Sequence, residues 1–309
     1  MAQLVVQNSY NNPLLSNVSI RYNNAQYQAD TIFPLLPVPK RTGNYFVYDK
    51  ENLRAPVETR RSDMARAQRV DQSVTKASYG PLTERSLEQG IPEDLMTEAE
   101  DPLAPMTDAT MNVTDKLLIQ REVDLASMIQ SSSTMTYNTG ITGANQWSNF
   151  NTSNPLQDVQ TAIAAMVANT MRPNTMIMGY NVWTQLVNHP IFQDRIKYSQ
   201  LGVLTTELAA RLFNVERIIV GEAVVNNAVE GQTDSLGFIW GKAVTLAYIS
   251  SAPGIRTPSF GYHITLAGKK YVDNWYEQPL KGYFVRANDY YDRKIFAQEA
   301  GYLLTTVVA

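Results

Sequence analysis

The stretch from Thr31 to Arg54, TIFPLLPVPKRTGNYFVYDKENLR, limits the possible folds of this chain most strongly. It places Pro34, Pro37 and Pro39 within six residues. Each proline fixes its own φ angle and pushes the preceding residue into an extended conformation, so no helix is expected around it. Because proline has no backbone N–H, the ribbon is also predicted to make few ladder hydrogen bonds. It is therefore either a proline-rich linker or a segment that reaches over a neighbouring chain.

Two further extended segments follow the proline ribbon. Residues 44–49, after Gly43, form a strand-like patch, and residues 73–80 form a second extended segment. Paired with each other, they would make a long two-stranded loop, which has no core of its own and is marginal in isolation. Residues 1–30, rich in Asn, Gln, Ser and Tyr, are predicted to be an irregular arm that is ordered by contact with something else.

The sign of the charge reverses between residues 54–85 and residues 86–101. The first stretch has seven basic residues against four acidic ones, and the second has six acidic residues with no Lys or Arg. Two solvated surfaces would explain this pattern. The alternative is that the basic stretch of one subunit lies on the acidic stretch of another, because complementary potentials fix register and orientation.

The remaining two thirds of the chain predict an α+β fold. Residues 107–130 have helical periodicity without an internal Gly or Pro, which predicts one long helix. Leu118, Leu125 and Ile129 would form an apolar stripe on one side of it, with Glu122 between them. Helices and strands mix from residue 153 to residue 252, where Asn154 and Thr205 are suitable N-caps. Antiparallel strands are predicted from about residue 253 to the end. The polar residues 131–153 are interpreted as a long surface loop or a weak hairpin.

Composition and motifs offer little support for an enzyme. The chain has no cysteine and only two histidines, His189 and His263, which are expected to be structural. No motif for phosphate, dinucleotide or zinc binding occurs, and no nucleophile, base and orienting group come together. An enzyme that uses surface carboxylates is the least favoured interpretation. We therefore expect no catalytic residues, no cofactor and no metal, and no stretch approaches the roughly 18 apolar residues of a membrane span.

The order of these parts resembles a known family. The pieces that carry the resemblance are Ala29-Asp30-Thr31-Ile32-Phe33-Pro34 with the following Pro37-Val38-Pro39, and residues 173–199, PNTMIMGYNVWTQLVNHPIFQDRIKYS, which run on into LTTELAARLFNVERIIVGEAV at 204–224. Over nearly the whole chain, this order is similar to the major capsid protein of tailed bacteriophages, the Hong Kong 97-like fold. The proline ribbon would then be the exit of an arm that meets a neighbouring subunit.

The resemblance implies a division of the chain. Residues 1–43 would be the N-terminal arm and residues 44–86 the extended loop, a β-hairpin that lies over the adjacent subunit. Residues 87–152 would be the first part of a peripheral domain, with its spine helix at 107–130. Residues 153–252 would form an α/β axial domain, and residues 253–309 the return strands of the peripheral domain and a C-terminal strand, which is expected to rejoin the axial domain.

The same resemblance implies a structural function. Copies of the chain would form the hexamers and pentamers of an icosahedral phage head that encloses double-stranded DNA, touching the DNA without sequence specificity. The alternative is an encapsulin-type shell around a protein cargo. The predicted contacts between subunits are Phe33, Pro34, Tyr45, Phe46, Tyr48, Arg60, Arg61, Arg66, Arg69, Glu93, Asp94, Glu98 and Glu100.

Expected partners follow from how such shells are built. The arm begins within about 30 residues of Met1, so a separate scaffolding protein, or assembly without one, is expected. A portal and a decoration protein are further expected partners, and no membrane is. No Lys–Asn pair can be singled out for a covalent crosslink between subunits. The resemblance places the protein in the virion after assembly in the cytoplasm of a bacterial host.

Overall fold

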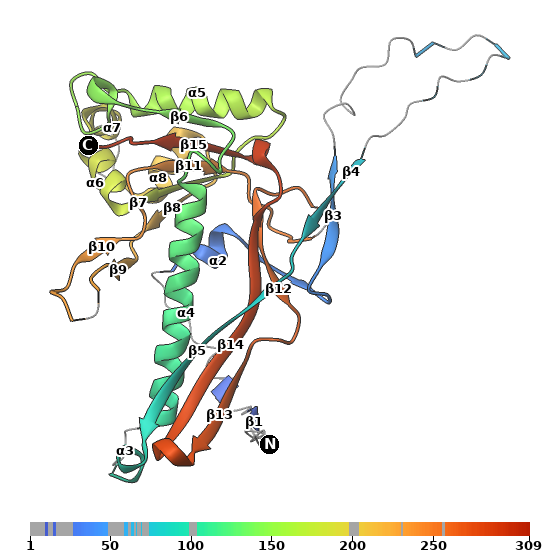
Figure 1. Ribbon diagram of the computed structural model, residues 1–309. Helices are drawn as coiled ribbons and strands as arrows, with labels where there is room; N and C mark the ends of the chain where they lie inside the picture. Colours follow the sequence, from blue (N-terminus) through green and yellow to red (C-terminus); the bar gives the residue numbers. More distant parts are fainter. Residues whose placement is uncertain are drawn as a thin grey trace.

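The computed structural model describes residues 10–11, 15–16, 27–48, 59–60, 63–64, 66, 69, 74–98, 104–197, 204–229, 231–254 and 257–309. Within them, the longer sheet runs alongside one long helix, α4, a second sheet lies at the C-terminal end of that helix, and a hairpin projects to one side (Figure 1). The predicted arm covers residues 1–43. Of its first 26 residues, the structure describes only 10–11 and 15–16.

The longer sheet has the strand order β1-β13-β14-β12-β2, and β5 also pairs with β14. All of its pairs are antiparallel except β12 with β2. The strands are β1 (Tyr10–Asn11), β2 (Leu35–Val38), β5 (Thr83–Pro92), β12 (Gly261–Leu266), β13 (Tyr271–Glu277) and β14 (Gly282–Ile295). Strand β5 leads into the short helix α3 (Glu93–Glu98), and the 3-10 turn η3 (Gln278–Leu280) joins β13 to β14.

The proline ribbon makes more sheet contact than its sequence predicted. Residues 35–38, with Pro37 among them, form strand β2, which pairs in parallel with β12 at the edge of the long sheet. At the ends of this pairing the β2 side supplies only acceptors, since the carbonyls of Pro34 and Val38 accept from His263 and Ala267. An edge strand tolerates proline because a missing N–H can face outward, so the prediction of a ladder-poor ribbon was wrong here.

A short helix also precedes the ribbon, where none was expected. Helix α2 (Ala29–Ile32) has no side-chain cap of its own. Its first backbone N–H groups instead donate to Glu122, which lies 93 residues further along the chain. A tertiary contact therefore supplies the start signal that the local sequence lacks.

Helix α4 (Pro105–Ile129) confirms the predicted long helix to within two residues at either end. Pro105 at its first turn suits a helix start, and 25 residues give a length of about 38 Å. Leu125 and Ile129 are fully buried, as the apolar stripe predicted. The helix runs beside β5 and β14 and reaches the second sheet at its C-terminal end (Figure 1).

The second sheet has the order β6-β15-β11-β7-β8. Its strands are β6 (Asn138–Gly140), β7 (Thr175–Gly179), β8 (Arg217–Gly221), β11 (Val244–Ala247) and β15 (Gly301–Thr305). The helices near it are α5 (Pro155–Ala168), α6 (Tyr180–Asn188), α7 (Pro190–Ile196) and α8 (Thr206–Phe213). The predicted caps are present, because Asn154 accepts from Gln157 N and Thr205 accepts from Leu208 N. The last strand, β15, lies inside this sheet, between β6 and β11.

Residues 131–153 are tied into the second sheet instead of forming a separate hairpin. Strand β6 pairs in parallel with β15, a partner more than 160 residues away. Trp147 is fully buried; its backbone N–H donates to Val307 and its indole Nε1 donates to Asp158 at 2.9 Å. The interpretation of this stretch as a weak local hairpin was therefore wrong.

Replacing Trp147 with alanine should lower the free energy of unfolding by about 3–5 kcal/mol, because it leaves a cavity in the core of the second sheet. Urea denaturation followed by circular dichroism measures this change. The matched control is Phe150→Ala, since Phe150 belongs to the same segment but is 39% exposed. Equal losses for the two variants would show that Trp147 does not anchor the segment.

Candidate assembly site

The most prominent feature is the hairpin of β3 (Gly43–Tyr48) and β4 (Val74–Tyr79), which projects away from the rest of the molecule (Figure 1). The two strands pair only with each other, from Gly43 opposite Tyr79 to Tyr48 opposite Val74. This confirms the predicted pairing of the two extended segments. Since an isolated two-stranded ribbon is marginal, the hairpin depends on what holds its base and on what it meets further out.

One face of the hairpin is anchored to its own chain. The Tyr45 ring is 5% exposed and stacks on Phe296 with ring centroids 4.2 Å apart. The Lys294 Nζ lies 5.6 Å from the centre of the same ring and donates to the Ser78 carbonyl. Burial raises the pKa of the Tyr45 hydroxyl, so the ring stays neutral at physiological pH.

Two of the residues predicted to contact a neighbouring subunit, Phe33 and Tyr45, are buried within their own chain. Phe33 is fully buried against Phe260, and Tyr45 is buried beside Phe296, so both rings pack on their own chain. Phe46 points to the other face of the hairpin and is 37% exposed. Pro34 is half-buried next to β2, and the side chain of Tyr48 lies outside the described residues.

We expect Tyr45→Ala to loosen the hairpin and Phe46→Ala to leave it attached, because the Tyr45 ring is buried in the core beneath the hairpin and the Phe46 ring is exposed. Truncating a buried aromatic side chain costs about 3 kcal/mol, which would raise the rate of trypsin cleavage at Lys76 at least tenfold. Limited proteolysis of unassembled protein reads this rate directly. If the two variants are cleaved equally fast, Tyr45 is not the anchor.

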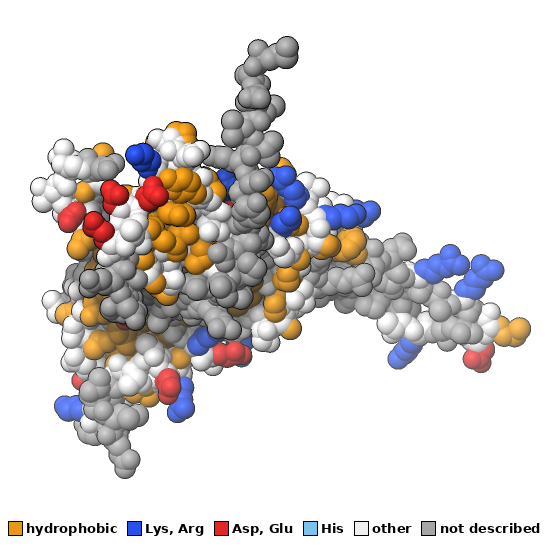
Figure 2. Space-filling view, turned by 90° about the horizontal axis from the view of Figure 1, so that it is seen from below, with side chains coloured by type: hydrophobic (Ala, Val, Ile, Leu, Met, Phe, Trp, Pro, Cys, Tyr) orange, Lys and Arg blue, Asp and Glu red, His pale blue; other side chains and the backbone are white. Residues whose placement is uncertain are grey.

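Beyond the hairpin, the described part of the loop is basic and exposed. Arg60, Arg66 and Arg69 are all exposed, whereas Arg61 lies outside the described residues. Figure 2 shows Lys and Arg side chains gathered along this projection. Their placement agrees with a solvated surface and equally with a surface that meets another subunit.

The described part of the acidic stretch (residues 86–101) runs along β5 to the end of the long sheet where β14 begins. Strand β5 and helix α3 contain it, and Glu93, Asp94 and Glu98 are exposed there; Glu100 lies outside the described residues. Part of this charge has partners within the chain. The Tyr276 hydroxyl donates to Glu93 at 2.9 Å, and Glu88 stands opposite Arg286 in the pairing of β5 with β14.

The middle of α4 is a buried polar junction that sequence reasoning did not find. The Glu122 carboxylate is fully buried and accepts three hydrogen bonds: from Gln28 N at 3.0 Å, Ala29 N at 2.7 Å and Trp240 Nε1 at 2.6 Å. Burial raises the pKa of Glu122, and the three hydrogen bonds oppose that shift. One side chain thus joins α2, α4 and the segment after β10 (Leu236–Phe238).

Arg121, the preceding residue, holds a second set of contacts. Its guanidinium is 4% exposed, contacts both carboxylate oxygens of Asp30 at 3.0 Å and contacts Asp289 at 2.5 Å. It also lies 4.5 Å from the centre of the Tyr291 ring. Burial raises the pKa of Asp289, while the nearby cations Arg121 and Lys270 lower it. Arg121 thereby ties the N-terminal segment to strand β14.

Asp124 completes the junction three residues after Arg121, on the same face of the helix. It forms ion pairs with Arg85 of β5 at 3.3 Å and with Arg293 of β14 at 2.7 Å. Three residues of α4, Arg121, Glu122 and Asp124, therefore bind the N-terminal segment, the strands β5 and β14, and Trp240 near the second sheet. The only signal in the sequence was a charged residue, Glu122, inside an otherwise apolar stripe.

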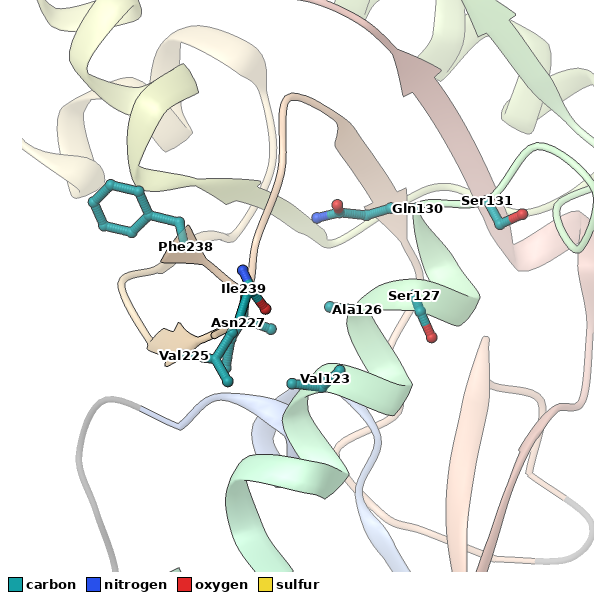
Figure 3. A pocket seen from close by; sticks show the side chains of 9 residues that line it. All are labelled: Val123, Ala126, Ser127, Gln130, Ser131, Val225, Asn227, Phe238 and Ile239. Carbon is teal, nitrogen blue, oxygen red and sulfur yellow. The ribbon is translucent and has the colours of Figure 1, made fainter. Parts of the chain in front are cut away.

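An open groove of about 370 Å³ lies between α4 and the hairpin of β9 (Val224–Asn226) and β10 (Leu236–Phe238). Figure 3 shows its nine lining side chains, which are apolar apart from Ser127, Gln130, Ser131 and Asn227. None of the nine is an acid–base group. Among the described residues no cluster of three or more metal-ligating side chains occurs, and no helix there is long and apolar enough to cross a membrane.

The fold is shared with solved structures, among them the capsid structure of Cyanophage P-SCSP1u, which superposes with a TM-score of 0.59 at 9% identity and covers 89% of this chain and 86% of that one. A phage-related protein from Bordetella bronchiseptica RB50 superposes with a TM-score of 0.77 at 24% identity, covering 97% of this chain and 98% of that one. A chain from the solved structure of Microbacterium phage Oxtober96 superposes with a TM-score of 0.61 at 10% identity, covering 92% of each chain. At these identities the likeness concerns the fold.

Sequence comparison then identifies the family. The chain is 30% identical over 304 residues to the major capsid protein of Burkholderia phage BcepMu, with 96% of each protein covered. The profile of the family described as phage major capsid protein E matches residues 132–236. This chain belongs to the family of phage major capsid proteins. Its role is structural, as a subunit of a capsid shell, and it is a component of the virion.

Proposed function

We propose that copies of this chain form the hexamers and pentamers of an icosahedral phage head with the Hong Kong 97-like fold, enclosing double-stranded DNA. The observation that carries this proposal is the 30% sequence identity with a phage major capsid protein, in an alignment that covers 96% of both chains. In this arrangement the hairpin of β3 and β4 and the loop beyond it lie over the adjacent subunit. The protein then has no catalytic role of its own.

The proposal assigns roles to the parts of the fold. The long sheet with α4 is the peripheral domain, and the sheet of β6, β7, β8, β11 and β15 is the centre of the axial domain around the five-fold and six-fold axes. Because residues 131–153 and 301–305 join that second sheet, we place the domain boundaries after α4 and before β15. Assembly would occur in the cytoplasm of the bacterial host, with a separate scaffolding protein, a portal and possible decoration proteins as partners.

Purification of the chain after expression in bacteria, followed by size-exclusion chromatography and analysis of particle contents, tests this proposal. Closed particles without a specific foreign protein support a capsid. Closed particles that enclose one particular host protein would instead support an encapsulin-type compartment, which the sequence relatives favour less.

A further inference from the structure

His263 is a buried ionisable side chain to which the shell function gives no role. It lies on β12 and is fully buried. The Phe33 ring meets it edge-on with centroids 5.7 Å apart, and the Tyr291 ring lies parallel to it at 6.1 Å. The imidazole therefore sits between the N-terminal segment and strand β14, next to the junction of α4.

The imidazole lies close to the contact that fastens α2. Among the described residues, neither ring nitrogen has a hydrogen-bond partner. The nearest opposite charge is Asp30 of α2, whose Oδ1 lies 3.5 Å from His263 Nδ1. That carboxylate already accepts both contacts from the Arg121 guanidinium. A buried polar ring without partners normally needs an explanation, and here it lies against the contact that fastens α2.

The charged groups around His263 make its protonation costly. Helix α4 contributes Arg121, α2 contributes Asp30, and β14 contributes Asp289, Tyr291 and Arg293. The paired strand β2 contributes no titratable side chain, and Lys270, before β13, is near Asp289 and Arg121. An imidazolium would add a third cation beside Arg121 and Arg293, and the Asp30 carboxylate is already paired with Arg121.

We propose that His263 is an acid-sensitive latch: a protonated ring is unfavourable in this buried site between two cations, so acid releases residues 28–33 from the long sheet while the second sheet stays folded. These residues are fastened by polar contacts and by the full burial of Ile32 and Phe33 in the core. The backbone N–H groups of residues 28 and 29 donate to the Glu122 carboxylate, and the Asp30 carboxylate accepts from Arg121. The Phe33 ring packs beside His263 itself.

The direction of the pH dependence follows from the environment of the ring. Burial first, and then the charges of Arg121 and Arg293, lower the pKa of His263 well below its ordinary value of 6.5. The released segment therefore binds a proton more readily than the attached one. Attachment is fully favoured above about pH 6.5 and weakens as the pH falls toward the lowered pKa, by up to about tenfold per pH unit.

Pulsed hydrogen exchange of the full chain, labelled at one fixed pH after incubation between pH 7.5 and 5.0, tests the latch. We expect protection of the Ala29 and Phe33 amides to fall at least tenfold toward pH 5.0 in the wild type, while β7 and β11 stay protected. In His263→Gln the fall should be less than twofold, and His263→Met provides a second neutral side chain if the first variant folds poorly.

The chain offers a matched control in its other histidine. His189 is also fully buried, but its ring nitrogens contact Ser153 Oγ at 3.0 Å and Ile191 N at 3.3 Å, beside the second sheet. His189→Gln should keep the wild-type pH profile at residues 28–33. The latch is overturned if a neutral side chain at 263 leaves that profile unchanged, or if β7 and β11 lose protection at the same pH as α2.

Discussion

Replacing Glu122 with alanine is expected to lower the free energy of unfolding by about 3–5 kcal/mol, because three buried donors each lose a hydrogen bond worth about 1–3 kcal/mol when left unmade. The donors are Gln28 N, Ala29 N and Trp240 Nε1. The loss is smaller than three full penalties, since burial of the carboxylate, which raises its pKa, is itself unfavourable and is relieved by the substitution.

Thermal unfolding should show this loss as a fall in Tm of roughly 6–10 °C, at about 2 °C per kcal/mol for a chain of this size. Lys116→Ala is the control, because Lys116 is an exposed residue of the same helix and its loss should leave Tm unchanged. Glu122→Gln should fall between the two, since it keeps one acceptor oxygen. A Tm for Glu122→Ala equal to that of the control would show that α2 does not depend on this carboxylate.

Reversing Arg60, Arg61, Arg66 and Arg69 to glutamate is expected to leave the subunit folded and to abolish closed shells. Four substitutions of two charge units each change the net charge from −3 to −11. The three described members are exposed, so the folded chain loses no buried contact. Under the proposed function, however, the loop would then meet the acidic stretch at residues 86–101 of the next subunit with the same sign of charge, which costs several kcal/mol per interface.

The reversal is measured by the yield of closed particles in electron microscopy, with circular dichroism to check the fold. Reversing the same number of basic residues elsewhere, at Lys116, Arg172, Lys197 and Arg211, is the matched control for net charge and should reduce the yield less. Normal yields from the loop variant would show that charge does not dock the loop.

The elements with strong local signals were predictable from the sequence. Helix α4 follows from 25 residues without an internal Gly or Pro after Pro105. The caps at Asn154 and Thr205 predicted the starts of α5 and α8. The pairing of β3 with β4 also followed from the two extended segments.

What the sequence could not show are the contacts made across the chain. Helix α2 forms because a carboxylate 93 residues away caps it, and β6 forms because β15 offers it an edge. Which of Tyr45 and Phe46 faces the rest of the chain depends on Phe296, which lies near the other end of the sequence. Alternation predicted that the two rings point to opposite faces, but only the packing decides which of them is buried.

The junction at Arg121, Glu122 and Asp124 illustrates the same limit. In the sequence these residues are one charged cluster on a helix, and such clusters are usually solvated. Their burial follows from partners in four separate segments, at residues 28–30, 85, 240 and 289–293. A charged residue at an apolar stripe position of a long helix is the one pattern that could have pointed to it.

Cryo-electron microscopy of the expressed chain, together with its neighbouring genes if it does not assemble alone, tests the central claim most directly. The account predicts closed icosahedral shells built of this chain in five-fold and six-fold rings, with the hairpin of β3 and β4 over the adjacent subunit. A discrete monomer that never assembles, even with those genes co-expressed, would contradict it.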